Sequence, residues 1–352
     1  MQRKSIVLVT GASGFIGGHC ILALLKQGYA VRGTVRSKSQ IEKCQALIND
    51  HYADHADVEY AIATLDSDEG WDAAVKDCEY VLHLASPLPL EQPKEPNDLI
   101  IPARDGALRV LTAASRAGVK RVVMTSSQGA VCGSPLIAKG YVYDEKDWTD
   151  LKHKTVTPYN QSKTIAEHAA WDFVSQENSI ELATICPGLV CGPTLEPRVN
   201  TSLEAVKRMM NGSFTLVPSV GYEVVDVRDV ADLHLLAMEK PQAAGGRFMA
   251  SAGFVWFHEM AETLRRDLGD SANRVSTRRA PAWLVQLLAL FDPAVATIVP
   301  ELNQLRRVSH ETSKKELGWI PRSPDEAITA TAKSLLTYGL LDDSPSKLPQ
   351  AN

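Results

Sequence analysis

The chain has 352 residues, of which 45% are hydrophobic and 22% are charged, and its formal net charge is −5. This length exceeds what one small core needs, so we expect a large domain with a smaller lobe. The mildly acidic balance argues against a nucleic-acid partner. No apolar run approaches the roughly 20 residues of a membrane-spanning helix, so we expect no membrane partner either.

The first apolar run, Ile6–Val9, is too short for the core of a signal peptide and is typical of a buried strand. None of the six cysteines forms a CxxC pair, which favours free thiols in a reducing compartment and no metal site. Only Cys186 and Cys191 are close enough in sequence to suggest a redox-sensitive pair. We therefore expect a cytoplasmic protein.

Short apolar runs alternate with amphipathic stretches through the first half of the chain, a pattern typical of a parallel sheet covered on both faces. The predicted strands are Ile6–Val9, Ala30–Val35, Val58–Ala63, Tyr80–Leu84, Arg121–Ser126 and Leu182–Cys186. The predicted helices are Phe15–Gln27, Ile41–Asp50, Gly70–Asp77, Leu99–Ala117 and Pro158–Gln176.

After Pro187 the alternation loosens. Strands are predicted at Val224–Val227 and Phe248–Ala250, and helices at Leu203–Asn211, Val230–Glu239, Phe257–Leu268, Pro281–Leu290 and Pro324–Tyr338, with a turn at Asp292-Pro293. We predict an α/β, Rossmann-type doubly wound fold. Residues 1–187 and 224–250 would form the nucleotide-binding domain, residues 188–223 and 251–340 a substrate-binding lobe, and residues 341–352 a flexible tail.

A glycine-rich turn follows the first predicted strand, with Gly11, Gly14 and Gly17 spaced GxxGxxG before a helix. Glycines at this spacing, between a strand and a helix, allow a tight turn and close approach to a pyrophosphate. The backbone amides of Phe15 and Ile16, at the positive end of the helix, are suited to phosphate oxygens. This segment predicts a dinucleotide site.

The end of the second predicted strand distinguishes between the two nicotinamide dinucleotides. An acidic residue there would hold the adenosine ribose and repel a 2′-phosphate. The chain instead has Arg36 followed by Lys38, and Lys43 on the next helix. Arginine can pair bidentately with a phosphate, so NADP(H) is the predicted cofactor.

Tyr159 and Lys163 form the only YxxxK in the chain, and Pro158 suits the first turn of a helix. This spacing puts both side chains on one helix face, where the ammonium group would stabilise an ionised phenol. Tyr159 could then act as a general acid toward a carbonyl oxygen. A hydroxyl from Thr125-Ser126-Ser127 would hold that oxygen, and strand alternation lets only one of the two serines face the site.

These segments resemble the extended short-chain dehydrogenase/reductase family, within it the dihydroflavonol reductase-like and cinnamoyl-CoA reductase-like aldehyde and ketone reductases. The resemblance spans residues 5 to about 340 and rests on TGASGFIG at 10–17, VRGTVRS at 31–37, LHLASP at 82–87, VVMTSSQG at 122–129, YNQSK at 159–163 and CPGLVCGP at 186–193.

The resemblance implies roles for particular residues. Ser127 would be the catalytic hydroxyl beside Tyr159 and Lys163. The implied cofactor contacts are Arg36 and Lys43 at the 2′-phosphate, Leu65 near the adenine, Ala85 and Ser86 at the ribose and nicotinamide, and Pro187 and Val190 at the carboxamide. Relatives carry an aspartate where this chain has Thr64, and Asp66 is the nearest acid.

The substrate end is predicted from Leu88–Leu90, Gln128, Cys132 and the loop from Thr194 to Tyr222. These residues are mostly apolar, and Arg198 is the one evident cation, so a hydrophobic aldehyde, ketone or β-keto ester is the expected small-molecule substrate. Flavonoid reductases carry an asparagine at the place of Cys132, which argues against a dihydroflavonol.

Three alternatives remain open at this point. A nucleotide-sugar epimerase or dehydratase shares the fold and the Tyr–Lys pair, although dehydratases add an acidic pair where this chain has Gln128-Gly129. A hydroxysteroid-type dehydrogenase would run in the oxidative direction. A non-catalytic NADPH-sensing protein would keep the glycine loop alone. We expect a monomer or a homodimer, with the helices 99–117 and 158–176 as the candidate dimer seam.

Overall fold

The computed structural model of the protein describes residues 5–52, 58–88, 93, 95–177, 179–291, 295 and 298–341. Three predicted features lie outside these residues: positions 89 and 90 of the substrate pocket, the turn at residues 292–293 and the tail beyond residue 341. No helix in the described part of the chain is long and apolar enough to cross a membrane.

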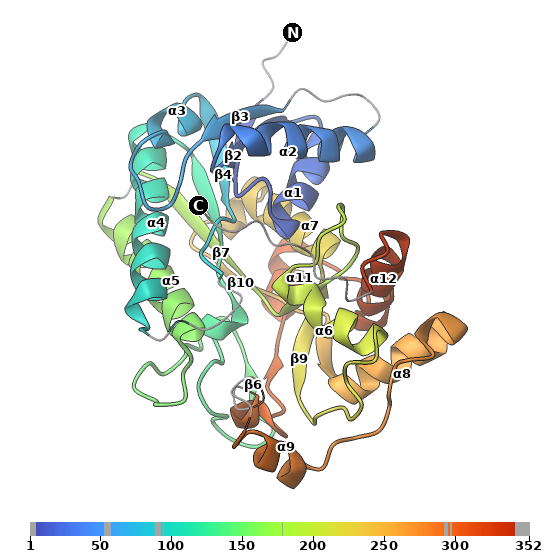
Figure 1. Ribbon diagram of the computed structural model, residues 1–352. Coiled ribbons are helices and arrows are strands. Elements are labelled where there is room, and N and C mark those ends of the chain that lie inside the picture. Colours follow the sequence, from blue (N-terminus) through green and yellow to red (C-terminus); the bar gives the residue numbers. More distant parts are fainter. Residues whose placement is uncertain are drawn as a thin grey trace.

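A seven-stranded parallel sheet forms the centre of the larger domain, as predicted (Figure 1). Its order is β10-β7-β5-β4-β1-β2-β3. Apolar runs such as IVLVT in β1 and RVVMT in β5 are buried almost throughout, because helices cover both faces of the sheet. The strands are β1 (Ile6–Thr10), β2 (Ala30–Val35), β3 (Glu59–Ile62), β4 (Cys78–His83), β5 (Arg121–Thr125), β7 (Glu181–Pro187) and β10 (Arg247–Ala250).

Two layers of helices enclose this sheet (Figure 1). One layer holds α1 (Phe15–Lys26), α2 (Lys38–His51) and α7 (Val227–Glu239), with α1 packed against α7. The other holds α3 (Trp71–Val75), α4 (Asn97–Arg116) and α5 (Pro158–Glu177), with α4 packed along α5. Each layer closes its own apolar cluster against one face of the sheet.

A second lobe is built around a three-stranded sheet of order β11-β9-β8. Its strands are β8 (Leu189–Cys191), β9 (Gly221–Asp226) and β11 (Gly253–Trp256), and the helices α6 (Thr201–Met210), α8 (Phe257–Leu268) and α12 (Pro324–Thr337) share its apolar cluster. Residues 224–250 are predicted to belong to the large domain, but the strand at residues 224–226 belongs to this smaller sheet. Residues 224–226 pair with β8 and β11, so the return begins with α7 and β10.

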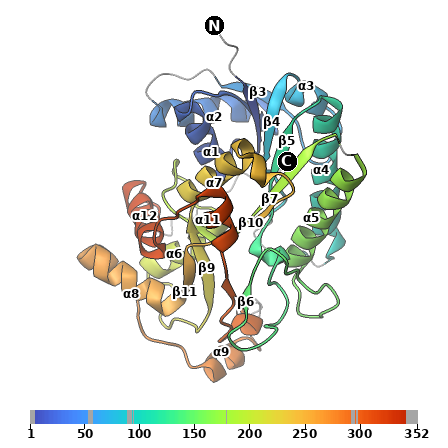
Figure 2. The ribbon, with the colours of Figure 1, turned by 180° about the vertical axis from the view of Figure 1, so that it is seen from behind.

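The remaining elements are short and connect the two lobes. A two-stranded parallel sheet joins β6 (Val142–Tyr143) to β12 (Arg307–Val308). The helix α11 (Glu311–Leu317) lies against β10 and α7, as Figure 2 shows, and α9 (Ala282–Leu288) lies near β6. Single 3₁₀ turns occupy Gln128–Ala130, Pro241–Ala243, Gly269–Ala272 and Val299–Glu301.

Candidate active site

The carboxyl ends of the parallel strands all meet at one edge of the large sheet, and the predicted site residues follow these ends. The strand order reverses between β1 and β4, because the chain proceeds from β1 toward β3 on one side and from β4 toward β10 on the other. Such a switch point leaves a crevice between the loops that follow the two central strands. The fold therefore gathers residues from distant parts of the sequence at this edge.

The glycine turn after β1 is packed too tightly to accept side chains. Gly11 has a φ of +69°, and a Cβ on Gly17 would lie 2.3 Å from the carbonyl oxygen of Gly11. The amide of Gly11 donates to Thr34 Oγ1 on β2 at 3.2 Å, which fixes the turn against the sheet. Gly14 then begins α1 without a side-chain cap. The turn is thus a bare backbone cradle that ends on the amides of Phe15 and Ile16, which suits a dinucleotide pyrophosphate.

The ends of β2 and β3 carry the residues predicted for the adenosine end. Arg36 follows β2 directly and is exposed, as is Lys43 on α2. The side chain of Leu65 packs on Gly106 of α4, and its carbonyl accepts from Arg109 at 2.7 Å. The hydroxyl of Thr64 donates a hydrogen bond to the exposed carboxylate of Asp66.

That hydrogen bond from Thr64 lowers the pKa of Asp66, which favours its ionised form. The exposed surface after β2 and β3 therefore carries two cations, Arg36 and Lys43, and the anion Asp66.

A buried hydrogen-bond relay holds the segment after β4. Thr10 Oγ1 accepts from the amides of Leu84 and Ala85, both at 3.0 Å, so its proton points to His83 Nδ1 at 2.9 Å. Burial, and secondarily the charge of Lys163, lowers the pKa of His83 to about 3. The neutral ring thereby fixes the backbone that leads into Ala85 and Ser86.

The two serines at the end of β5 face opposite sides, as strand alternation requires. Ser126 Oγ donates to the buried carboxylate of Glu167 at 2.5 Å. Ser127 keeps an extended backbone, and its Oγ accepts from the amide of Gly129 at 3.0 Å. The hydroxyl of Ser126 is occupied by its hydrogen bond to Glu167. Of the two serines, Ser127 is therefore the one whose hydroxyl could still contact a substrate oxygen, which is the assignment that the resemblance implies.

Tyr159 and Lys163 lie in the first turns of α5, one turn apart, with Lys163 Nζ 6.0 Å from the centroid of the Tyr159 ring. Lys163 is only 7% exposed. The helix approaches the loop after β5 very closely, because a Cβ on Gly129 would lie 2.5 Å from Oδ1 of Asn160, and one on Gly133 would lie 2.6 Å from its Nδ2. These two glycines, which sequence reasoning missed, let α5 bring its pair up to Ser127.

The residues after β7 border the same place. Pro187 ends β7, and Val190 lies buried in β8. A Cβ on Gly188 would lie 3.0 Å from Oε1 of Gln128, so the buried Gln128 amide stands between the β5 loop and this segment. Within the described residues its Nε2 has no hydrogen-bond partner. Gln128 therefore offers a donor beside Ser127.

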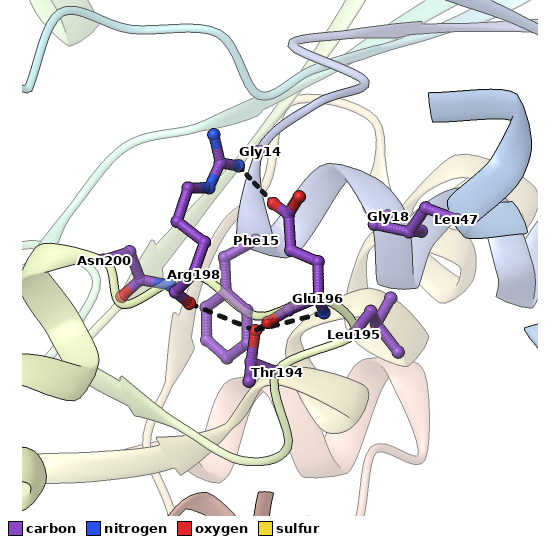
Figure 3. A pocket seen from close by; sticks show the side chains of 9 residues that line it. All are labelled: Gly14, Phe15, Gly18, Leu47, Thr194, Leu195, Glu196, Arg198 and Asn200. Carbon is purple, nitrogen blue, oxygen red and sulfur yellow. Dashed lines mark hydrogen bonds and ion pairs between the residues drawn. The ribbon is translucent and has the colours of Figure 1, made fainter. Parts of the chain in front are cut away.

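The other predicted substrate residues divide between two places. Burial raises the pKa of Cys132 to about 12, and desolvation raises that of Tyr222, yet Cys132 is partly exposed and Tyr222 is 36% exposed. Leu88 is 52% exposed after β4. Thr194 lies elsewhere, in a pocket with Gly14 and Phe15 of the glycine turn (Figure 3).

A buried ion pair that sequence reasoning missed holds α5 against the large sheet. Glu167 is fully buried and accepts from Arg247 Nε at 2.8 Å, as well as from Ser126 and Thr184. The guanidinium of Arg247 also stacks on the ring of Trp148, with 3.7 Å to the centroid. The pair and its neighbours tie α5 to β7, to the start of β10 and to Ser126, which follows β5. No local pattern reveals it, because Arg247 is 80 residues away from Glu167.

The predicted redox pair is not formed. Cys186 and Cys191 are both free and buried, and they pack in different apolar clusters. Desolvation raises the pKa of each thiol to about 12. Buried thiols of this kind are poor nucleophiles at neutral pH.

Comparison with known proteins agrees with this geometry. The profile described as the NAD dependent epimerase/dehydratase family matches residues 7–250, which is more than half of the chain. The chain belongs to this family. The match covers the glycine turn, the serines, the Tyr–Lys pair and Pro187, so the predicted family resemblance is confirmed.

Several proteins that are similar to this chain are reductases. A cinnamoyl-CoA reductase of Medicago truncatula is 39% identical over 68% of this chain and 74% of its own length. An anthocyanidin reductase of Vitis vinifera is 32% identical over 75% of this chain and 81% of its own. Among solved structures, the yeast methylglyoxal/isovaleraldehyde reductase Gre2 with NADPH superposes with a TM-score of 0.77 at 26% identity, covering 96% of this chain and all of that one.

Proposed function

We propose that this chain is an NADPH-dependent carbonyl reductase that converts a hydrophobic aldehyde, ketone or β-keto ester to the alcohol. The observation that carries the proposal is the convergence of Ser127, Tyr159 and Lys163 at the carboxyl edge of the sheet, beside the glycine cradle. The reductases among the relatives, and the NADPH complex of Gre2, support it.

The cofactor fits the residues that would hold it. The backbone cradle of Gly11, Gly14 and Gly17 would take the pyrophosphate, since a Cβ on these glycines would press on Ala85 or on the turn's own backbone and disturb its shape. Arg36 and Lys43 would take the 2′-phosphate, and no acid stands at the end of β2 to repel it. Ala85, Ser86, Pro187 and Val190 would border the nicotinamide half. When bound, NADPH supplies a hydride for the carbonyl carbon.

The protein's own side chains handle the oxygen of the substrate. The Ser127 hydroxyl donates a hydrogen bond to the carbonyl oxygen and orients it toward Tyr159. The Tyr159 phenol then gives that oxygen its proton, and the ammonium of Lys163 stabilises the phenolate that remains. The oxygen gains one proton in the same reaction in which the carbon gains a hydride, so an alcohol results.

Two features of the substrate end favour a carbonyl over a sugar nucleotide. The position beside Ser127 holds the amide of Gln128 rather than the carboxylate that a dehydratase would use. The Nε2 of Gln128, which has no hydrogen-bond partner among the described residues, would suit a second oxygen on the substrate, as in a β-keto ester. Cys132 and Tyr222 add apolar surface around it.

The test is a panel of aromatic aldehydes, aliphatic ketones and β-keto esters, with oxidation of NADPH and of NADH followed in parallel. We expect turnover on at least one class, with NADPH preferred. Tight NADPH binding without turnover on any of them would contradict the reductase and favour a sugar nucleotide substrate or a sensor.

A further inference from the structure

The segment from residue 193 to residue 200, which follows β8, is held firmly against the glycine turn. The carbonyl of Pro193 contacts Nε2 of His19 on α1 at 2.9 Å, and the carbonyl of Leu195 contacts Nε2 of His51 on α2 at 2.8 Å. From the other side, Tyr338 OH donates to the Leu195 carbonyl at 3.1 Å. The position of this segment is therefore set by three helices and not by the glycine turn itself.

Arg198 reaches from this segment to the glycine turn, away from the substrate end where the sequence suggested it. Its Nη2 donates to the carbonyl oxygen of Ser13 and forms an ion pair with Glu196 at 2.6 Å. Figure 3 shows the guanidinium and the Glu196 carboxylate next to Gly14 and Phe15. The Arg198 side chain is 54% exposed, so it is not a core residue.

The contacts of Arg198 leave most of its hydrogen-bonding capacity free. Both of its side-chain contacts within the described residues use the same nitrogen, Nη2, so Nε and Nη1 have no acceptor there. A guanidinium offers five donors in a planar fork that matches phosphate oxygens. An arginine held at a surface with two free nitrogens is prepared for an anionic ligand.

An anion site lies directly beside this guanidinium. Ser13 immediately precedes Gly14, the residue from which α1 begins, and α1 has neither a side-chain cap nor an acidic residue in its first turn. The amides at such a helix start attract negative charge. Arg198 and the α1 amides thus flank one small region from two directions.

We propose that Arg198 is a pyrophosphate-binding residue of the cofactor site, which donates from Nε and Nη1 to phosphate oxygens when the dinucleotide binds while Nη2 keeps its ion pair with Glu196. This inference rests on the proposed function only for the identity of the ligand as a nicotinamide dinucleotide. Because NADPH and NADH share the pyrophosphate, Arg198 increases affinity for both. Arg36, beside the 2′-phosphate, increases affinity for NADPH alone.

Glu196 gives the proposal a second consequence. With Arg198 in place, the carboxylate of Glu196 is neutralised by its ion pair. Without Arg198, that carboxylate would stand uncompensated close to the incoming phosphates and repel them. Removing both charges together therefore harms binding less than removing Arg198 alone.

The experiment measures dissociation constants by calorimetric titration of NADPH, NADH and 2′-AMP, which carries the 2′-phosphate but no pyrophosphate. The proteins are the wild type, Arg198→Ala, Arg198→Ala/Glu196→Gln, Arg36→Ala and, as a matched loss of one charge, Arg116→Ala at the exposed end of α4. Thermal unfolding of each variant checks that the fold is kept.

We expect Arg198→Ala to raise the Kd of both dinucleotides about tenfold, the effect of one lost charge-assisted hydrogen bond, and to leave 2′-AMP unchanged. The double variant should recover part of this loss. Arg36→Ala should weaken NADPH and 2′-AMP but not NADH, and Arg116→Ala should change nothing.

Dinucleotide affinities of Arg198→Ala that match those of Arg116→Ala would overturn the inference, as would an equal loss for 2′-AMP. A wild type that binds neither dinucleotide would overturn it together with the proposed cofactor. A wild type that binds both and loses both on Arg198→Ala, yet reduces no carbonyl, would support this inference and contradict the proposed function.

Discussion

Ser126 and Ser127 are adjacent in the chain, but their hydroxyls face opposite sides and have different partners. The hydroxyl of Ser126 belongs to the buried network of Glu167, while that of Ser127 lies at the loop that α5 approaches. The division follows from the alternation of side chains along β5 and from the place of Glu167 on the helix behind it. The hydroxyl of Ser126 is thus structural, and that of Ser127 is the one we propose to contact the substrate.

This division predicts different results for the same substitution at adjacent positions. Ser127→Ala should lower kcat by about a hundredfold and leave the stability nearly unchanged, because it removes a hydrogen bond to the reacting oxygen. Ser126→Ala should lower the free energy of unfolding by about 1–3 kcal/mol and largely keep kcat, because it takes a partner from a buried carboxylate. Steady-state kinetics and urea unfolding of both variants measure this. Equal losses of kcat would show that the assignment is wrong.

Residues of the site differ in how far the sequence could predict them. Gly11, Tyr159 and Lys163 stand in short motifs whose spacing carries their chemistry. Glu167 and Arg247 lie 80 residues apart, and nothing in either neighbourhood indicates that they pair. Arg198 lies in a segment whose sequence suggested the substrate end, and only the fold shows that the segment returns to α1.

At the scale of elements, long buried strands follow from the sequence and short ones do not. Strands such as β1 and β5 have apolar runs that burial on both faces requires, and they match the prediction closely. The two-residue strands β6 and β12 have no periodicity to detect, since their pairing joins positions 142–143 and 307–308. The apolar run at Val224–Val227 suits either sheet, and only the pairing of β9 with β8 and β11 shows that it belongs to the smaller one.

The junction of α5, β5, β7 and β10 depends on the pair Glu167–Arg247. Glu167→Leu should lower the free energy of unfolding by about 3–5 kcal/mol, because it leaves the buried charge of Arg247 without compensation. Urea unfolding measures the change. Arg266→Ala, which breaks the exposed ion pair with Asp325, serves as the control and should have little effect. A loss no larger than that of the control would mean that the pair does not support the junction.

The link between β1 and β4 through His83 predicts a pH dependence. The pKa of His83 is about 3 in the folded protein and 6.5 when exposed, so below pH 6.5 the unfolded chain binds a proton that the folded chain does not. Stability attributable to His83 is therefore present above pH 6.5 and is lost as pH falls toward 3. His83→Asn keeps an acceptor for Thr10 and removes this titration.

Between pH 7 and pH 5 the wild type should lose about 2 kcal/mol more unfolding free energy than His83→Asn does. Urea unfolding of both proteins at the two pH values gives the difference directly. Parallel losses in the two proteins would show that His83 is not held neutral by the fold.

At the scale of the whole molecule, two lobes divide the work. The parallel sheet brings the glycine cradle and the Ser–Tyr–Lys group to one edge. The second lobe contributes Tyr222 from β9, and the segment after β8 brings Arg198 to the glycine turn. Both contributions come from chain beyond Pro187, where the sequence pattern is weakest.

In the reaction that we propose, Tyr159 gives the proton to a carbonyl oxygen. The most direct test is a single turnover of protein loaded with NADPH, mixed with the best carbonyl of the panel, for the wild type and for Tyr159→Phe, with the Kd of NADPH measured for both. We predict a rate at least about a hundredfold lower in the variant at a nearly unchanged Kd. A variant that reduces the carbonyl at close to the wild-type rate would contradict the account.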